Sequence, residues 1–212
     1  MSANYDNASW FYERLSKLVF GNAQMNAQEY FLNFIPASAS ILIIGGGTGQ
    51  ILESITKLYP SGLHITYVEI SANMMVLSRK RDVAHNEVTY ITQDIGHLSL
   101  TQEFDVVITA FLFDNFSAQD VSHIFPQIHQ SLKFDGLWLN TDFQLTGPVW
   151  QKIMLKTMYY FFKLLNAVKV TQLPGTAKVF AIYNYQLLTE KTFYGKFMIA
   201  KAYKKSRTPM QL

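Results

Sequence analysis

The chain has no cysteine among its 212 residues. This absence excludes disulfide bonds, thiolate nucleophiles and iron–sulfur clusters, as well as zinc sites built on thiolate ligands. Charge is also sparse, because Asp, Glu, Lys and Arg make up only 16% of the residues. Long apolar runs are missing, and the segment Met1 to Trp10 is polar without a basic start. We therefore expect no secretory signal, no membrane-spanning segment and a cytoplasmic location.

The charges that are present are distributed unevenly. Residues 1–150 contain 7 Lys or Arg and 14 Asp or Glu, whereas residues 151–212 contain 11 Lys or Arg and one acid, Glu190. A basic segment raises the local concentration of anionic partners, but solvated edges of helices and strands give the same count. The count alone does not decide between these two interpretations.

Short apolar runs alternate with stretches of helical periodicity in the first two thirds of the chain, which predicts a parallel sheet with helices on both faces. A helix over Gln50–Leu58 and another that contains Met74 are examples. Nearly continuous apolar strands indicate burial on both sides of the sheet. The five expected strands are Ser40–Ile44, His64–Glu69, Val88–Thr92, Phe104–Ala110 and Leu137–Asp142.

The ends of the chain add elements outside this repeat. Helices are expected over Ala8–Val19 and Asn26–Phe34, and an antiparallel hairpin over Gln186–Phe193 and Lys196–Lys204 brings the sheet to seven strands. With a hydrophobic content of 49%, the length suits a single domain. We divide it into an N-terminal helical cap (1–36), a cofactor-binding core (37–145), a helical lid or wall (146–176) and the terminal hairpin (177–204).

The lid is predicted as one long helix, Pro148–Val168, with Pro148 in its first turn. Tyr159 and Tyr160 lie off its main apolar stripe, so we expect them to need a second partner, with the substrate favoured over a membrane surface or another subunit. We expect Trp150 and Tyr160 to face the acceptor. The stripe expected to pack on the core consists of Trp150, Ile153, Met154, Met158, Phe161, Phe162 and Leu165.

A glycine-rich turn joins the first strand to the helix that begins at Gln50, in the sequence Ile41-Leu42-Ile43-Ile44-Gly45-Gly46-Gly47-Thr48-Gly49. Such a turn lets a ligand approach the backbone, and the helix start supplies free N–H groups. Glu69 follows twenty residues after Gly49, at the end of the second strand, where a carboxylate can accept hydrogen bonds from a ribose. Gln50 stands where the dinucleotide pattern G-x-G-x-x-G has its third glycine.

The pattern G-x-G-x-G resembles motif I of the class I S-adenosylmethionine-dependent methyltransferases. Four further segments resemble the family's later motifs in order: Val68 to Met74, Thr92 to Ile95, Phe104 to Ala110 and Leu132 to Leu139. The resemblance implies a Rossmann-like seven-stranded α/β fold, mostly parallel with an antiparallel terminal strand, and S-adenosylmethionine as cofactor. The cofactor-binding residues that it implies are Gly45, Gly46, Gly47, Gly49, Glu69, Ile70, Met74, Asp94, Ile95, Ala110 and Phe111.

The chain departs from the family's pattern at three positions. Phe134 and Asp135 replace a proline and a glycine before the fifth strand, and Ile43 replaces an acid that usually lies near the methionine end of the cofactor. Recognition of the cofactor's amino group must then rely on backbone carbonyls, water or the N-terminal segment. A cofactor-binding protein without turnover is therefore one alternative, and a nicotinamide-dependent oxidoreductase is another.

Methyl transfer from a sulfonium needs positioning and exclusion of water, with no metal and no covalent intermediate. A base would help a hydroxyl or carbon acid react, and the candidates are Asp114, Asp142, His123 and His129. Ala110-Phe111-Leu112-Phe113 lacks the Pro-Pro turn of methylases that act on nucleic-acid bases, and Asp142-Phe143 lacks the acid-amide pair of metal-dependent catechol-type enzymes. We expect a small, apolar or aromatic acceptor and no nucleic acid; the sequence predicts no oligomeric state.

Overall fold

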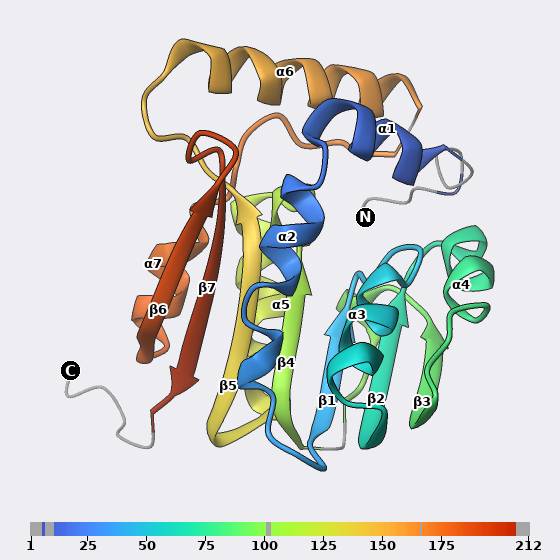
Figure 1. Ribbon diagram of the computed structural model, residues 1–212. Helices are drawn as coiled ribbons and strands as arrows, with labels where there is room; N and C mark the ends of the chain where they lie inside the picture. The colour runs from blue at the N-terminus through green and yellow to red at the C-terminus, as the bar shows by residue number, and fades with distance from the viewer. Residues whose placement is uncertain (1–5, 7–10, 101–102, 166, 207–212) are drawn as a thin grey trace.

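The computed structural model describes residues 6, 11–100, 103–165 and 167–206, and these form a seven-stranded sheet with helices on both faces (Figure 1). The strand order is β3-β2-β1-β4-β5-β7-β6; β7 pairs antiparallel with β5 and β6, and the other pairs are parallel. The expected fold class is confirmed, including the antiparallel strand between β5 and β6. The strands are β1 (Ser40–Ile44), β2 (Ser61–Glu69), β3 (His85–Thr92), β4 (Phe104–Ala110), β5 (Leu132–Phe143), β6 (Tyr185–Phe193) and β7 (Met198–Lys205).

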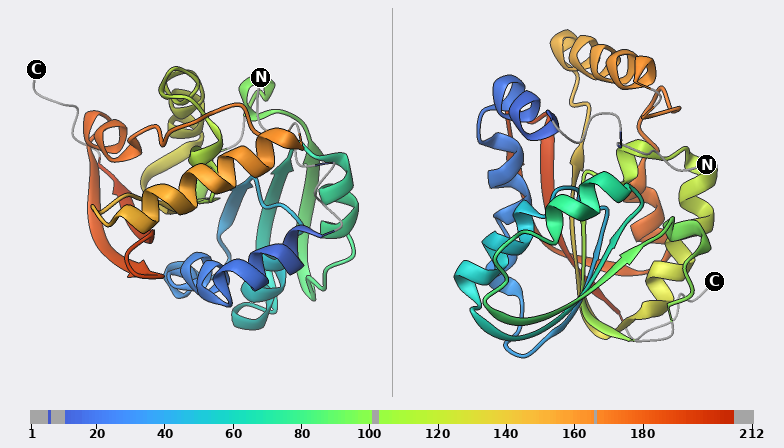
Figure 2. Two further views of the ribbon diagram at one scale, coloured as in Figure 1. Left: turned by 90° about the horizontal axis from the view of Figure 1, so that it is seen from above. Right: turned by 90° about the vertical axis from the view of Figure 1, so that its right-hand side faces the viewer.

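The helices form two layers and a cover. On one side of the sheet lie α2 (Ala23–Glu29) and α3 (Gln50–Leu58), and on the other lie α5 (Ala118–Ser131) and α7 (Thr176–Ile182) (Figures 1 and 2). Helix α4 (Ala72–Ser78) follows β2 near the edge of the sheet. Helices α1 (Tyr12–Phe20) and α6 (Val149–Leu164) cross the end where the parallel strands finish. This is the end at which open α/β sheets bind ligands.

Strand β1 shows why the apolar strands are continuous. Ile41 and Ile43 belong to the core beneath α2 and α3, whereas Leu42 and Ile44 belong to the core beneath α5 and α7. Alternate side chains point to opposite faces of a strand, so a strand covered on both faces needs apolar residues at every position. A third cluster, which includes Phe143 and Tyr159, joins the end of the sheet to α6.

Local signals define several helix boundaries. The hydroxyl of Ser117 accepts a hydrogen bond from the Asp120 backbone N–H at 3.1 Å, and the Asp120 carboxylate accepts one from the Ser117 N–H, so the two residues form a capping box at the start of α5. Ser71 caps α4 in the same way through the Met74 N–H. Asp135, which replaces a glycine of the family's pattern, has a φ of +62°, and Asp is one of the residues that tolerate this conformation.

Several expected boundaries were wrong. Helix α7 lies in the segment expected to be only loop and hairpin, and α6 ends at Leu164 rather than Val168. The second N-terminal helix is α2 followed by a 3₁₀ turn, η1 (Leu32–Phe34). The predicted first helix begins at Ala8, which lies outside the described residues, and α1 begins at Tyr12. Strands β2, β3 and β5 each begin several residues earlier than predicted.

The predicted orientation of α6 was also wrong. Its buried side chains are Gln151, Leu155 and Tyr159; none of them belongs to the predicted stripe, and Tyr159 was predicted to lie off it. Ile153, from the predicted stripe, is 61% exposed. Met154, Met158 and Phe162 do pack partly against the third core cluster. The buried face is therefore rotated relative to the prediction.

Candidate active site

The glycine-rich loop and Glu69 are joined directly. Oε2 of Glu69 accepts a hydrogen bond from the Gly47 N–H at 2.9 Å, and Oε1 accepts one from the Ser71 N–H at 2.8 Å. The carboxylate is buried, which raises its pKa, while these backbone donors oppose the rise. A carboxylate has about four lone-pair positions, so Glu69 keeps room for a further donor from a ligand beside its backbone partners.

The glycines of the loop serve different purposes. A Cβ on Gly46 would lie 2.3 Å from the ring of Tyr67, and one on Gly49 would lie 2.8 Å from the backbone of Ser78. These two glycines are required by internal packing. Gly47 has a φ of +61°, and its Cβ would meet only the sulfur of Met74 at 3.5 Å. Gly47 is thus the glycine where added side-chain atoms would enter the space available to a ligand.

A cavity of about 650 Å³ lies at the carboxyl ends of β1, β2 and β4. The strand order reverses between β1 and β4, so the cavity occupies the switch point of the sheet. Gly49 does not line it, and neither does Ile43, whose side chain is buried in the core beneath α3. The other predicted cofactor-binding residues all line the cavity: Gly45, Gly46, Gly47, Glu69, Ile70, Met74, Asp94, Ile95, Ala110 and Phe111.

Hydrogen bonds fix the backbone near Asp94 and at the end of β4. Oδ1 of Asp94 accepts a hydrogen bond from the Gly96 N–H at 2.9 Å, which caps the 3₁₀ turn η2 (Ile95–His97). Phe111 has a φ of +52°, uncommon for a bulky residue, and its N–H donates to the Thr141 carbonyl at 2.7 Å. This bond ties the residue after β4 to β5, and it holds Phe111 at the cavity wall.

Two carboxyl groups, Asp114 in the turn after β4 and Asp142 near the end of β5, are buried, but only Asp114 lines the cavity. Burial raises the pKa of Asp142 to about 7, against hydrogen bonds from backbone N–H groups such as that of Phe143. Burial, reinforced by the negative charge of Asp142, raises the pKa of Asp114 well above its usual range. One proton shared by the pair avoids two buried negative charges.

Both histidine candidates lie away from the cavity. His123 is exposed on α5. His129 lies on the same helix, and its Nδ1 is 3.1 Å from the Tyr185 hydroxyl. Burial and the nearby charge of Lys205 lower the pKa of His129 to about 4. Neither residue lines the cavity, so neither is placed to act as the base.

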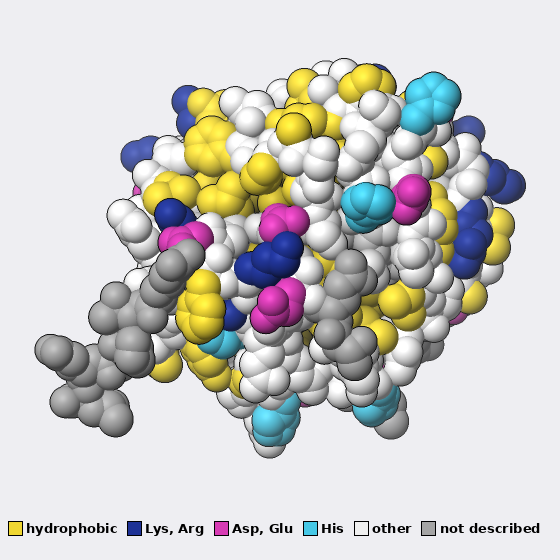
Figure 3. Space-filling model, turned by 90° about the horizontal axis from the view of Figure 1, so that it is seen from below, with side chains coloured by type: hydrophobic (Ala, Val, Ile, Leu, Met, Phe, Trp, Pro, Cys, Tyr) yellow, Lys and Arg dark blue, Asp and Glu magenta, His cyan; other side chains and the backbone are white. Residues whose placement is uncertain are grey.

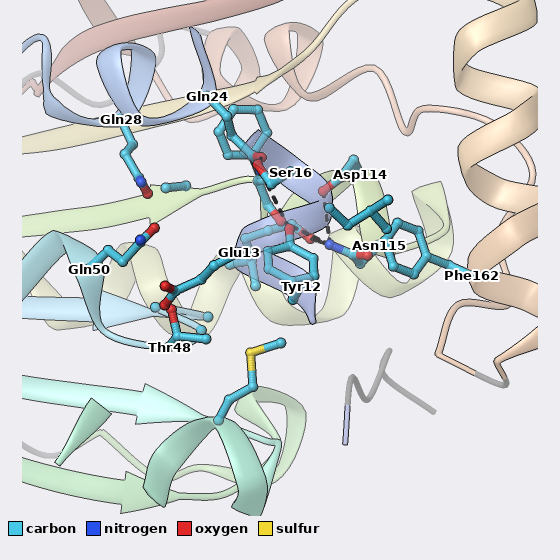
Figure 4. Close-up of a pocket in the computed structure, with 18 of the residues that line it drawn as sticks. Tyr12, Glu13, Ser16, Gln24, Gln28, Thr48, Gln50, Asp114, Asn115 and Phe162 are labelled. Carbon is cyan, nitrogen blue, oxygen red and sulfur yellow. Dashed lines mark hydrogen bonds between the residues drawn. The ribbon is translucent and has the colours of Figure 1, made fainter. Parts of the chain in front are cut away.

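The N-terminal segment supplies polar cavity residues that the sequence did not single out. Tyr12, Ser16 and Gln24 point into the same space as Asp114 and Asn115, as Figure 4 shows. The Ser16 hydroxyl donates to the Gln24 side-chain carbonyl, and the Gln24 amide donates to the Tyr12 hydroxyl at 3.4 Å. Burial raises the pKa of Tyr12 to about 12, so its phenol stays protonated near neutrality. The only hint in the sequence was the missing acid at Ile43.

Helix α1 is tied down over the cavity from both sides. The Arg81 Nε donates to the Thr48 carbonyl at 2.9 Å, and its guanidinium forms a salt bridge with Glu13 of α1. Opposite, the ring of Tyr12 lies 6.2 Å from that of Phe162 on α6. Helices α1 and α6 together therefore cover the carboxyl end of the sheet (Figure 2).

The apolar wall comes from the ends of β4 and β5 and from α6. Trp150 and Tyr160, predicted to face the acceptor, do not line the cavity: Trp150 packs against Tyr194 and Phe197, and Tyr160 faces solvent. The Tyr159 hydroxyl donates to the Asp114 carbonyl at 2.9 Å. The apolar and aromatic residues of the wall include Phe111, Leu112, Phe116, Phe143, Met154, Met158, Tyr159, Phe161 and Phe162.

The described residues contain no group of three or more His, Asp or Glu side chains arranged to hold a metal ion. Nor does any helix among them have the length and apolar character needed to cross a membrane.

Comparison with proteins of known sequence finds methyltransferases that are similar to part of this chain. Residues 41–136 match a methyltransferase domain family. A malonyl-[acyl-carrier protein] O-methyltransferase of Bacillus cereus is 33% identical over 107 residues, which are 50% of this chain and 38% of that protein. One of the same name from Priestia megaterium is 26% identical over 143 residues, 68% of this chain and 51% of that protein. The chain therefore matches at most about half the length of these relatives.

Comparison with solved structures extends the likeness to the whole fold. The mitomycin 7-O-methyltransferase MmcR superposes with a TM-score of 0.66 at 17% identity, over 92% of this chain and 57% of that one. The N-methyltransferase NodS of Bradyrhizobium japonicum, in complex with S-adenosylhomocysteine, gives 0.68 at 12% identity over 94% of both chains. The matched segment 41–136 contains β1, the glycine loop, β2 and β4, so this part of the chain is similar to a methyltransferase domain, and the chain as a whole has the fold of these methyltransferase structures.

Proposed function

We propose that this chain transfers a methyl group from S-adenosylmethionine to a small, apolar or aromatic acceptor. The observation that carries the proposal is a single cavity with two chemically different ends. One end has the glycine loop, Glu69 and Asp94, and the other has rings and thioethers such as Phe143 and Met158. The family's cofactor fits the first end, where a buried carboxylate and the close approach allowed by Gly47 suit a ribose and its neighbours.

S-adenosylmethionine supplies an electrophilic methyl on a positively charged sulfur. The protein then has to hold the acceptor in line with that methyl and exclude water. Phe111 and Met158 bound the space in which the acceptor would lie, and α1 and α6 cover it. In this proposal the cofactor's amino group is recognised by three residues of the N-terminal segment, Tyr12, Ser16 and Gln24, since Ile43 does not reach the cavity.

Asp114 is the proposed acid–base group, because it is the one candidate that lines the cavity. A hydroxyl that donates to the Asp114 carboxyl would pass its proton to the Asp114–Asp142 pair as its oxygen bonds the methyl carbon and the bond from that carbon to sulfur breaks. Asp142 is a positioning residue in this scheme, since it acts through Asp114. No nucleic acid is expected as acceptor, and a cytoplasmic location remains a prediction from the sequence.

The names of the relatives suggest a second acceptor class, an acyl group linked to a carrier protein. The family match, however, ends at residue 136, before Asp142 and α6. The similarity therefore supports the part of the site that would bind S-adenosylmethionine. For the part that would bind the acceptor, we favour a free small molecule, because the cavity wall there is apolar.

Two measurements test the proposal. Calorimetry with S-adenosylhomocysteine and with NAD, run side by side, should show binding of the first and none of the second; the reverse result would support the nicotinamide-dependent alternative. A screen of cell extracts for compounds that gain the mass of one methyl group in the presence of S-adenosylmethionine should then find the acceptor. Binding of S-adenosylhomocysteine without any methylated product, with acyl-carrier substrates included, would support a binding protein without turnover.

A further inference from the structure

Helix α6 has apolar side chains on its outer face as well as on the face that lines the cavity. Val149, Ile153, Tyr160 and Leu164 are exposed by 70%, 61%, 67% and 65%. Their spacings of four, seven and four residues place them on one side of a helix. We call these four residues the outer apolar row. It runs along the whole of α6, which stands at the outermost edge of the molecule (Figure 2).

A row of lysines runs beside the outer apolar row. Lys152, Lys156 and Lys163 are exposed, and each follows a member of that row by three residues, which makes the two side chains neighbours on the helix surface. The sequence of α6 contains no Asp or Glu. None of the salt bridges found within the described part of the chain involves these three lysines.

The opposite end of the molecule is different. There, Lys133 pairs with Asp105 at 2.8 Å and Lys204 pairs with Asp135 at 3.2 Å. Figure 3, which views the molecule from that end, shows Lys and Arg side chains beside Asp and Glu side chains. Lysines at that end are thus paired with acids, whereas the three lysines of α6 have no such partner among the salt bridges of the described residues.

We propose that the outer face of α6 binds the surface of an anionic lipid membrane. A helix with bulky apolar side chains on one face and lysines at its flank lies in the plane of the interface, with the apolar residues among the acyl chains and the lysines at the phosphate groups. Tyr160 and the partly exposed Trp150 have the amphipathic rings that favour this boundary. This inference goes beyond the proposed function and does not depend on it.

Charge and shape favour a membrane over other occupants. A second copy of the chain would bring the same three lysines and no acid from its own α6, so the charges would have no partner. An acidic protein would match the charge, but the outer apolar row is a convex ridge, and protein interfaces gain most from anchors inserted into pockets. A planar, deformable anionic surface matches both the straight ridge and the lysine row.

The test is sedimentation of the full chain with vesicles of phosphatidylcholine alone or mixed with phosphatidylglycerol. We expect binding to the mixed vesicles that weakens as salt is added. Replacing Lys156 by Gln should weaken the binding about fivefold, and replacing all three lysines should weaken it about a hundredfold. Ile153→Ser should also weaken it. A matched control pair on α7, Lys178→Gln and Ile182→Ser, changes equally exposed residues on another face and should leave binding unchanged.

Binding of S-adenosylhomocysteine provides the check on folding, since none of the substituted residues lines the cavity. A chain that binds this ligand but not mixed vesicles would overturn the membrane proposal and leave the proposed function intact. Equal losses in the α6 and α7 variants would also overturn it. A mass that increases with protein concentration and is reduced by Ile153→Ser would assign the ridge to a second copy, and salt-sensitive binding to an acidic carrier protein alone would assign it to a protein partner.

Discussion

The carboxylate of Glu69 accepts a hydrogen bond from the Gly47 N–H at 2.9 Å, and this bond links the end of β2 to the glycine loop after β1. The residue predicted to bind the ribose thus also shapes the loop predicted to approach the rest of the cofactor. A second bond, from the Ser71 N–H, fixes the other carboxylate oxygen. Changes at Glu69 should therefore affect both ligand binding and the order of the loop.

Replacing Glu69 by Ala should weaken binding of S-adenosylhomocysteine by about ten- to a hundredfold, because a hydrogen bond to a charged group contributes roughly 1.5 to 3 kcal/mol. Isothermal calorimetry measures the change. Glu87→Ala is the matched control, since this acid is exposed on β3 far from the cavity. An affinity that does not change in the Glu69 variant would remove the residue from the site.

Gly46 and Gly47 should respond differently to substitution. Gly46→Ala drives a methyl group into the ring of Tyr67 and should lower the free energy of unfolding by 1 kcal/mol or more, on the order expected for overpacking. Gly47→Val should preserve the far-ultraviolet spectrum and abolish ligand binding, because its side chain enters the cavity. Thermal melts and calorimetry separate the two effects. A folded Gly47→Val protein that still binds ligand would make the loop purely structural.

These contrasts show what the sequence could and could not predict. The strands and the glycine loop were predictable because burial on both faces leaves an unbroken apolar run, as in β1. The orientation of α6 was not, since it carries apolar residues around most of its circumference. Gln151 hides the buried face further: its side chain accepts from the Thr146 N–H at 2.7 Å and donates to the Gly195 carbonyl at 3.0 Å, so a polar residue occupies a core position.

The acid–base candidates show a second limit. Asp114 and the two histidines all lie between β4 and β5 in the sequence, but α5 carries the histidines behind the sheet while Asp114 remains at the cavity. Distance along the chain does not reveal this separation. The N-terminal contribution of Tyr12 and Gln24 depends on contacts between segments far apart in sequence, which no local pattern records.

The buried acid pair should give the protein an unusual dependence of stability on pH. The pKa of Asp142 is raised to about 7, so the folded state binds the proton more tightly than the unfolded state does. Its stabilising contribution is complete below the unfolded pKa of about 4 and is lost as the pH rises through 7, by up to about 1.4 kcal/mol per pH unit. Asp142→Asn should flatten this slope in denaturant unfolding followed from about pH 4 to about pH 7, the range between the two pKa values.

Asp120 should give a dependence of stability on pH that is opposite to that of Asp142. Its pKa is lowered, chiefly by the hydrogen bond from the Ser117 side chain, so it stabilises the fold above its unfolded pKa and less at lower pH. Asp120→Asn should therefore remove stability at neutral pH without changing the slope below pH 7 that is ascribed to Asp142. Identical pH profiles for wild type and Asp142→Asn would show that the pair does not share a proton.

Asp114→Asn should lower turnover more than it lowers cofactor affinity, because the side chain faces the acceptor region of the cavity. Loss of a general base typically costs about 10²- to 10⁴-fold in rate. The expected signature is loss of the acidic limb in the pH profile of turnover, which a merely structural change would not remove. Turnover that keeps its pH profile in the Asp114 variant would exclude the residue as the base.

The inner face of α6 should determine how the acceptor is held. Met158 and Phe162 line the cavity, whereas Tyr160, two residues from each, points to solvent. Met158→Ala and Phe162→Ala should therefore raise the KM for the acceptor found in the methylation screen while leaving S-adenosylhomocysteine affinity nearly unchanged, since the contacts with the glycine loop and Glu69 are retained. Tyr160→Ala is the matched control on the same helix and should leave KM unchanged in the absence of vesicles. If Tyr160→Ala changes KM and Phe162→Ala does not, the outer face of α6, and not its inner face, contacts the acceptor.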